Sequence, residues 1–128
     1  MPKEATILII EDDKFLNDLI GKKLEREGFK IFSVIDGERG LEILKEEEVD
    51  IILLDLLLPG MHGFEFLRLI KGDPKVKNIP VIILSNLGQK EDVEKGLALG
   101  AIDYLVKAGV TLDEIVVKID SIIKKIGR

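Results

Sequence analysis

Polar and charged side chains stand at the ends of four apolar runs in this sequence. They are Glu11, Asp12 and Asp13 after residues 5–10, Asp55 after residues 49–54, Ser85 after residues 79–84, and Lys107 after residues 101–106. The runs are short and aliphatic, which is typical of strands buried on both faces of a parallel sheet. Ligand crevices of such sheets lie outside the carboxyl ends of the strands, so the fold would bring these side chains to one edge. For Asp55 alone, a turn-capping role ahead of Pro59 and Gly60 stays open.

The chemistry of this set points to a divalent cation and a phosphoryl group. Carboxylates about 5 Å apart repel each other by about 3 kcal/mol per pair at an effective dielectric constant of about 20, so a cluster of them needs a cation. The chain has no cysteine and one histidine, His62, which we interpret as a solvated turn residue. Oxygen ligands would therefore select a hard ion, Mg²⁺. A carboxylate beside Mg²⁺, with a hydroxyl and an ammonium converging on it, is suited to accept a phosphoryl group.

The elements that must position these side chains alternate along the chain. Strands are predicted at residues 5–10, 30–34, 49–54, 79–84 and 101–106. Helices are predicted at residues 14–27, about 37–47, 63–71, 90–99 and 112–126, the first with an apolar face of Leu16, Leu19, Ile20 and Leu24. The last helix begins with a capping box at residues 111–114. Such alternation predicts the α/β class, with one parallel sheet covered by helices on both faces.

The composition excludes several other classes of protein. A chain of 128 residues fits a single domain, residues 1–128, which can bury a sizeable core. The absence of cysteine excludes disulfides, and residues 1–4 show no signal peptide, so we expect a cytoplasmic protein. The apolar stretch around Asp55 is far shorter than the ~20 residues of a membrane span. A formal net charge of -5 argues against direct binding of nucleic acid.

With these residues at these spacings, the sequence resembles the receiver domain of two-component response regulators over nearly its whole length. In that family an acidic pair ends the first strand and a phosphorylatable Asp ends the third. A Ser or Thr follows 30 residues later and a Lys 22 residues after that. Here 85 minus 55 is 30, and 107 minus 85 is 22. The resemblance implies a doubly wound, flavodoxin-like sheet of five parallel strands in the order 2-1-3-4-5, with five helices.

The resemblance also implies a role for each acid. Asp55 would be the phosphorylated residue, and Asp12 would bind Mg²⁺ directly. Glu11 would act on the metal mainly through water, and Leu57 would offer its backbone carbonyl. Asp13 would cap the first helix instead of binding the metal, although three adjacent acids leave the choice of ligand open.

The remaining family positions form a switch. Lys107 would pair with the phosphoryl oxygens, and Ser85 would donate its hydroxyl to one of them. The loop after Ser85 would then move inward, and Tyr104, three residues before Lys107, would turn in behind it. Such a change is a shift between populations of one fold.

The implied function is a phospho-accepting signalling switch that is not itself an enzyme. It would take a phosphoryl group from a histidine kinase or phosphotransfer protein and bind a downstream protein target, as a monomer or a phosphorylation-dependent dimer. The expected kinase-docking patch consists of Leu16, Ile20, Ala108 and Val110, although Leu16 and Ile20 are also candidates for the core. The chain ends about where the fifth helix ends, so a stand-alone regulator and an excised domain both fit.

Two other functions are compatible with parts of this pattern. A pseudo-receiver, which keeps the fold as an interaction module without phosphorylation, is the alternative. A Mg²⁺-dependent phosphatase with an aspartyl nucleophile is remote, because Leu57 stands where such enzymes commonly carry a second acid.

Two departures from the family pattern carry expectations. Ala108 follows Lys107, where the family usually has a proline joined by a cis peptide. A cis bond before a residue other than proline costs about 3 to 4 kcal/mol, so we predict a trans bond here. Leu57 and Leu87 are apolar at positions that in the family influence attack by water. We therefore expect slow autodephosphorylation.

Overall fold

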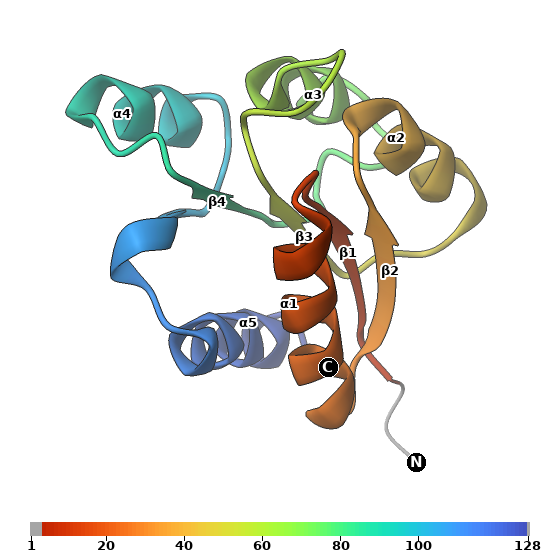
Figure 1. The fold of residues 1–128 in the computed structure, drawn as a ribbon. Helices are drawn as coiled ribbons and strands as arrows, with labels where there is room; N and C mark the ends of the chain where they lie inside the picture. The colour runs from red at the N-terminus through yellow and green to blue at the C-terminus, as the bar shows by residue number, and fades with distance from the viewer. Residues whose placement is uncertain (1–3, 128) are drawn as a thin grey trace.

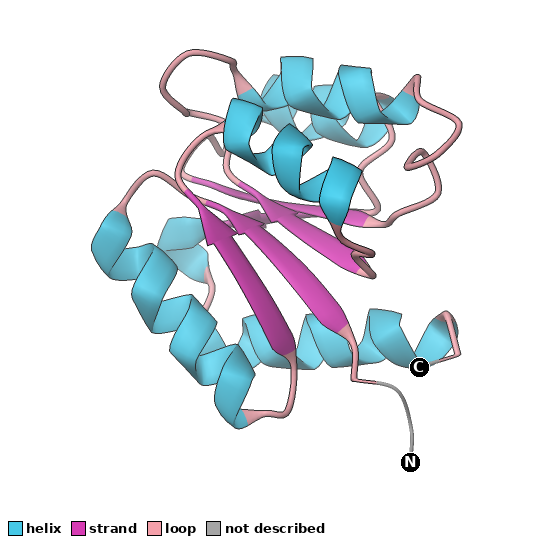
Figure 2. Cartoon of the chain, turned by 90° about the vertical axis from the view of Figure 1, so that its right-hand side faces the viewer, coloured by secondary structure: helices cyan, strands magenta, loops and turns pink. Residues whose placement is uncertain are grey.

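The computed structural model describes residues 4–127 as one parallel sheet with helices packed on both faces (Figures 1 and 2). The strands are β1 (Thr6–Ile10), β2 (Lys30–Val34), β3 (Ile51–Leu54), β4 (Val81–Ser85) and β5 (Asp103–Val106). The helices are α1 (Lys14–Arg26), α2 (Gly37–Glu46), α3 (Gly63–Lys71), α4 (Lys90–Ala98) and α5 (Leu112–Lys125), with a short 3₁₀ helix, η1 (Lys107–Gly109), before α5. The strand order β2-β1-β3-β4-β5, parallel throughout, confirms the predicted order 2-1-3-4-5.

Side chains alternate along the strands and build two cores, one on each face of the sheet. Ile7 and Ile9 of β1 pack with α1 and α5, whereas Leu8 and Ile10 pack with α2 and α3. All residues of β1, β3 and β4 are buried, which explains why these strands are apolar on both faces. The strand ladders set the register, and the strand ends lie along one edge of the sheet.

Three strands begin two residues later than the sequence pattern predicted, at Ile51, Val81 and Asp103. Val49 and Ala101, which the pattern assigned to strands, are only 8% and 7% exposed but lie outside the ladders. An apolar residue can be buried without pairing in a strand. A prediction from hydrophobicity therefore starts these strands too early. The 3₁₀ helix η1 was not predicted.

The apolar face predicted for α1 is wrong at one position. Leu19 is 42% exposed, and the buried residues of this helix are Asn17, Ile20, Gly21 and Leu24. The helix ends at Arg26, one residue earlier than predicted, and Gly28 follows with a φ of 97°, the left-handed conformation that glycine supplies after a helix.

Two expectations from the sequence, the absence of a signal peptide and the bounds of the domain, involve the ends of the chain. Residues 1–3 and residue 128, which include the start where no signal peptide was predicted and both ends of the predicted domain, lie outside the described residues. Within residues 4–127, no helix has both the length and the hydropathy that crossing a membrane requires.

Candidate functional site: an acidic pocket at the carboxyl ends of the strands

Side chains from three strand ends meet at one point of the sheet edge. The ammonium of Lys107, after β5, lies 2.7 Å from Oε1 of Glu11, after β1. The same ammonium lies 2.9 Å from Oδ2 of Asp55, after β3. The side chains of Glu11 and Asp55 are 3% and 5% exposed, and that of Lys107 is 16% exposed. Residues far apart in the sequence therefore form one buried charge cluster.

A third carboxylate completes the acidic side of this pocket. Glu11, Asp12 and Asp55 each offer an oxygen, and these oxygens lie within 4.8 Å of one another. Asp12 is exposed, so the cluster opens to solvent on its side. The carboxylate of Asp13 accepts a hydrogen bond of 3.2 Å from the N–H of Leu16 and caps α1, as predicted. Three clustered carboxylates, two of them in contact with the Lys107 ammonium, form an oxygen donor set of the kind that hard divalent cations prefer.

The backbone around Asp55 is fixed on both sides. Its N–H donates to the carbonyl of Ile10 at 3.0 Å, and its Oδ1 accepts from the N–H of Leu56 at 2.7 Å. The first residue of α3 is Gly63, where a Cβ would lie only 2.5 Å from the Asp55 carbonyl oxygen. A glycine is therefore needed for α3 to begin this close to Asp55. Leu57 follows in the loop with a 52% exposed side chain.

The loop between β1 and α1 is held by a residue that the sequence interpretation missed. Nδ2 of Asn17, in α1, donates to the carbonyl of Glu11 at 2.9 Å and to the carbonyl of Val34 at 3.0 Å. Oε2 of Glu11 accepts from the N–H of Asp13 at 3.1 Å. The sequence could have indicated this role, because Asn17 stands three positions before Ile20 on the buried face of the helix, where an apolar residue is expected.

Burial and crowding shift the pKa values in this pocket. Burial, together with the charge of Asp55, raises the pKa of Glu11 from 4.5 to about 7, and the contacts with Lys107 and the Asp13 N–H offset this only in part. Burial alone would lower the pKa of Lys107, but its hydrogen bonds to Glu11 and Asp55 raise it above its ordinary value. Lys107 therefore stays charged, and the pocket holds more acids than it can neutralise.

The two predicted switch residues both bind one residue of the β4–α4 loop. Ser85 is fully buried, and its Oγ accepts from the N–H of Leu87 at 3.2 Å. The hydroxyl of Tyr104 donates to the carbonyl of the same Leu87. Burial raises the pKa of Tyr104, and the charges of Asp92 and Asp55 add to this effect. The loop position is thus linked to Ser85 and Tyr104 at the same time.

The segment after Lys107 agrees with the sequence prediction. The peptide between Lys107 and Ala108 is trans, and the 3₁₀ helix η1 lies directly before the loop to α5. In the expected docking patch, Ile20 is only 1% exposed and belongs to the core. The apolar residues that α1 exposes on its surface are Phe15 and Leu19, at 77% and 42%.

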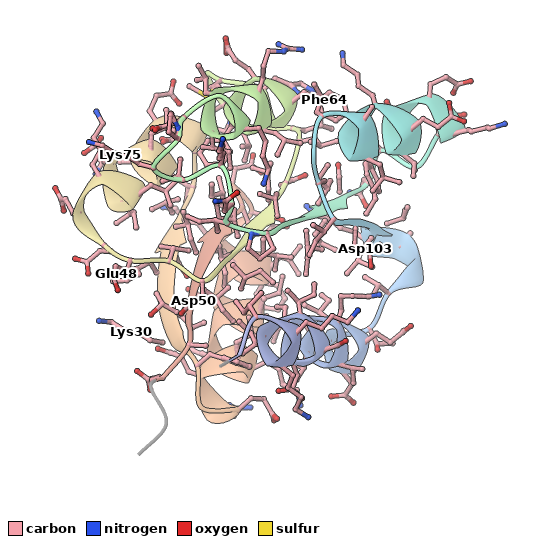
Figure 3. The ribbon with its side chains drawn as sticks, turned by 180° about the vertical axis from the view of Figure 1, so that it is seen from behind. Lys30, Glu48, Asp50, Phe64, Lys75 and Asp103 are labelled. Carbon is pink, nitrogen blue, oxygen red and sulfur yellow. The ribbon has the colours of Figure 1, made fainter. Side chains whose placement is uncertain are left out.

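His62 is exposed, as predicted, and it also caps α3. Its Nδ1 accepts from the N–H of Phe64 at 3.0 Å, and the two ring centroids are 5.1 Å apart. Phe64 lies at the start of α3 on the side of α4 (Figure 3), and the Lys95 ammonium of α4 is 5.0 Å from its ring centroid. His62 therefore has a local structural role outside the acidic pocket.

Comparison with known proteins agrees with this geometry. The chain matches the response regulator receiver domain family over residues 7–120. The cell cycle response regulator CtrA of Brucella ovis is 40% identical over 119 residues, which are 93% of this chain and 50% of that protein. The DNA-binding dual master transcriptional regulator RpaA of Synechocystis is 34% identical over 122 residues, 95% of this chain and 50% of that protein.

Solved structures give the same result. The receiver domain of the Francisella response regulator 1452 is 30% identical with a TM-score of 0.89, covering 95% of this chain and 98% of that one. The chemotaxis response regulator CheY4 of Vibrio cholerae, at 23% identity and a TM-score of 0.86, shares the fold over 94% of this chain and 99% of that one. This chain therefore belongs to the response regulator receiver domain family, the phospho-accepting modules of two-component phosphorelays. It spans about half the length of the curated relatives described above.

Proposed function

We propose that Asp55 is the residue that accepts the phosphoryl group from a phosphohistidine donor. The observation that carries this proposal is the convergence of Asp55 with Glu11, Asp12 and the Lys107 ammonium at the carboxyl ends of the strands. The 5% exposed Asp55 side chain sits beside a fixed cation, which suits a nucleophile that must acquire further negative charge. Receiver domains are phosphoryl-accepting switches and not classical enzymes.

The acidic pocket fits Mg²⁺. Asp12 and Asp55 would bind it directly, Glu11 mainly through water, and Leu57 through its backbone carbonyl. In support, three carboxylates cluster within 4.8 Å of one another, and every donor of the cluster is oxygen. When bound, Mg²⁺ would neutralise charge on the phosphoryl oxygens and offset the repulsion among the acids.

The transfer itself needs one bond to form and one to break. A carboxylate oxygen of Asp55 attacks phosphorus, and the bond between phosphorus and the donor imidazole nitrogen breaks. That nitrogen keeps the bonding electron pair, and the product on Asp55 is an acyl phosphate. Lys107, now 2.9 Å from Asp55 Oδ2, would pair with a phosphoryl oxygen.

The response would start at Ser85. Its hydroxyl would donate a hydrogen bond to a phosphoryl oxygen, while its Oγ already accepts a hydrogen bond of 3.2 Å from the N–H of Leu87. Because the Tyr104 hydroxyl donates a hydrogen bond to the carbonyl of Leu87, a movement of the β4–α4 loop would change the environment of Tyr104 as well. The face formed by α4, β5 and α5 would then present a different surface to a downstream protein.

The implied partners are proteins. The donor would be a histidine kinase or a phosphotransfer protein, and the setting would be the cytoplasm. The phosphorylated domain would act as a monomer or as a phosphorylation-dependent dimer on a protein target, without itself binding nucleic acid. The net charge of -5 supports the last point.

The test is incubation with a small phosphodonor such as acetyl phosphate in the presence of Mg²⁺, followed by mass spectrometry of the intact protein. Wild type should gain the mass of one phosphoryl group, and Asp55→Asn should gain none. Asp12→Asn should lose most of the reaction, whereas Asp13→Asn, which keeps a helix-capping side chain next to the site, should react like wild type. Transfer to wild type and Asp55→Asn alike would contradict the assignment, and no transfer to wild type would favour the pseudo-receiver.

A further inference from the structure

We propose that Asn17 is a positioning residue that holds the β1–α1 loop in the conformation in which Asp12 and Glu11 bind Mg²⁺. This inference rests on the proposed metal site. Asn17 is 4% exposed and lies in the first turns of α1, behind the acidic loop. It does not belong to the acidic cluster, so its effect on the metal would act through the backbone of the loop.

The hydrogen bond to Glu11 fixes the orientation of Asp12. Nδ2 of Asn17 donates to the Glu11 carbonyl at 2.9 Å. This carbonyl and the N–H of Asp12 belong to one planar peptide group. Fixing the oxygen therefore fixes the plane from which the Asp12 side chain extends toward Asp55.

The second hydrogen bond of Asn17 anchors this arrangement to the sheet. The same Nδ2 donates to the carbonyl of Val34, at the end of β2, at 3.0 Å. The Val34 carbonyl also accepts from the N–H of Glu11 at 3.1 Å. The loop is thus tied to the end of a neighbouring strand through both sides of Glu11. A movement of the loop away from Asp55 would break the side-chain hydrogen bond from Asn17 to Glu11 and the backbone hydrogen bond from Glu11 to Val34.

The other end of the Asn17 amide carries a cost that an apolar residue at this position would not. Within residues 4–127, its buried Oδ1 has no hydrogen-bond partner. An unpaired buried acceptor is unfavourable, and asparagine is also a poor helix former. The neighbouring buried positions on this face, Ile20 and Leu24, are apolar and carry no such cost. A local rule that is broken beside a site is expected where function requires the residue.

The direct test is the affinity of the unphosphorylated protein for Mg²⁺, measured by isothermal titration calorimetry with MgCl₂. Asn17→Ala and Asn17→Leu, which keeps the branching of the side chain, both remove the two hydrogen bonds that Nδ2 donates. We expect each to weaken Mg²⁺ binding by about tenfold, the lower end of the effect of groups that orient metal ligands. Leu24→Ala is the matched control, because it empties a buried position of the same helix away from the loop. It should lower the thermal stability and leave the dissociation constant unchanged.

A second measurement separates positioning from a general loss of structure. In metal-free protein, amide hydrogen exchange at Asp12 and Asp13 should become faster in the Asn17 variants and stay unchanged in Leu24→Ala. At saturating Mg²⁺, phosphorylation by acetyl phosphate should largely recover in the Asn17 variants.

The possible outcomes distinguish this inference from the proposed function. Wild-type Mg²⁺ affinity in a folded Asn17 variant would overturn the inference and leave the proposed function intact. Loss of folding in both variants would mean that Asn17 has a structural role instead. A wild-type protein that binds no Mg²⁺ would overturn the proposed metal site, and the role of Asn17 with it.

Discussion

Ionisation of Glu11 should destabilise the metal-free fold as the pH rises. Burial raises the pKa of Glu11 from 4.5, its ordinary value, to about 7 in the folded protein. At a pH between these two values, the folded protein holds a proton that the unfolded chain has released. Because the folded state then binds more protons than the unfolded state, the free energy of unfolding falls with increasing pH across this window.

The size of this effect follows from the shift. One pKa unit corresponds to about 1.4 kcal/mol, so a rise from 4.5 to about 7 amounts to about 3 kcal/mol. Glu11→Gln keeps the shape of the side chain and removes its titration. From about pH 4 to about pH 8, we expect the free energy of unfolding of wild type to fall relative to the variant by about 3 kcal/mol.

The measurement is urea unfolding, followed by circular dichroism in the presence of EDTA at several pH values. Glu42→Gln, which removes an exposed acid from α2, should leave the pH dependence of wild type unchanged. Added Mg²⁺ should flatten the wild-type curve, because metal binding requires the ionised carboxylates. Parallel curves for wild type and Glu11→Gln in EDTA would refute the reasoning.

Two further predictions concern the loop after Asp55. Gly63→Ala should destabilise the fold by about 3 kcal/mol in urea unfolding, because the new Cβ would lie 2.5 Å from the Asp55 carbonyl oxygen and backbone atoms must move. Gly109→Ala, where a Cβ would meet nothing within 4 Å, should cost nothing, and equal losses in the two variants would contradict this explanation. The exposed apolar Leu57 offers attacking water no hydrogen bond, so the phosphorylated protein should decay slowly. The loss of the phosphoryl group can be followed by mass spectrometry, and a phosphoryl lifetime of seconds in the presence of Mg²⁺ would contradict this expectation.

The meeting of Asp55 with Glu11 and Lys107 was predictable from the sequence because it depends on topology. Aliphatic runs identify buried parallel strands, and the carboxyl ends of parallel strands share one edge of the sheet. The side chain that follows each run must therefore point toward the same place. The strand starts were harder to predict, since buried apolar residues such as Val49 precede the ladders.

Asn17 and Leu19 could not be assigned correctly from the pattern. Helical periodicity places apolar residues on the buried face, yet here the amide of Asn17 is buried and Leu19 is 42% exposed. What decides between them is the position of two backbone carbonyls, those of Glu11 and Val34, which accept hydrogen bonds from the Asn17 amide. Carbonyl positions depend on the three-dimensional packing of β1 against β2, and no one-dimensional pattern contains them.

The charge balance of the pocket connects its geometry to its use. One ammonium, that of Lys107, lies within 2.9 Å of two buried carboxylates, and a third, Asp12, lies beside them. Burial and the charge of Asp55 raise the pKa of Glu11, and the contact with Lys107 offsets this only in part. A divalent cation would supply the missing charge and would leave Lys107 able to turn from Asp55 to a phosphoryl oxygen. A pocket fully neutralised by its own side chains would lack this demand for a cation, so the excess of acid would favour both the proposed metal and the transfer of a phosphoryl group.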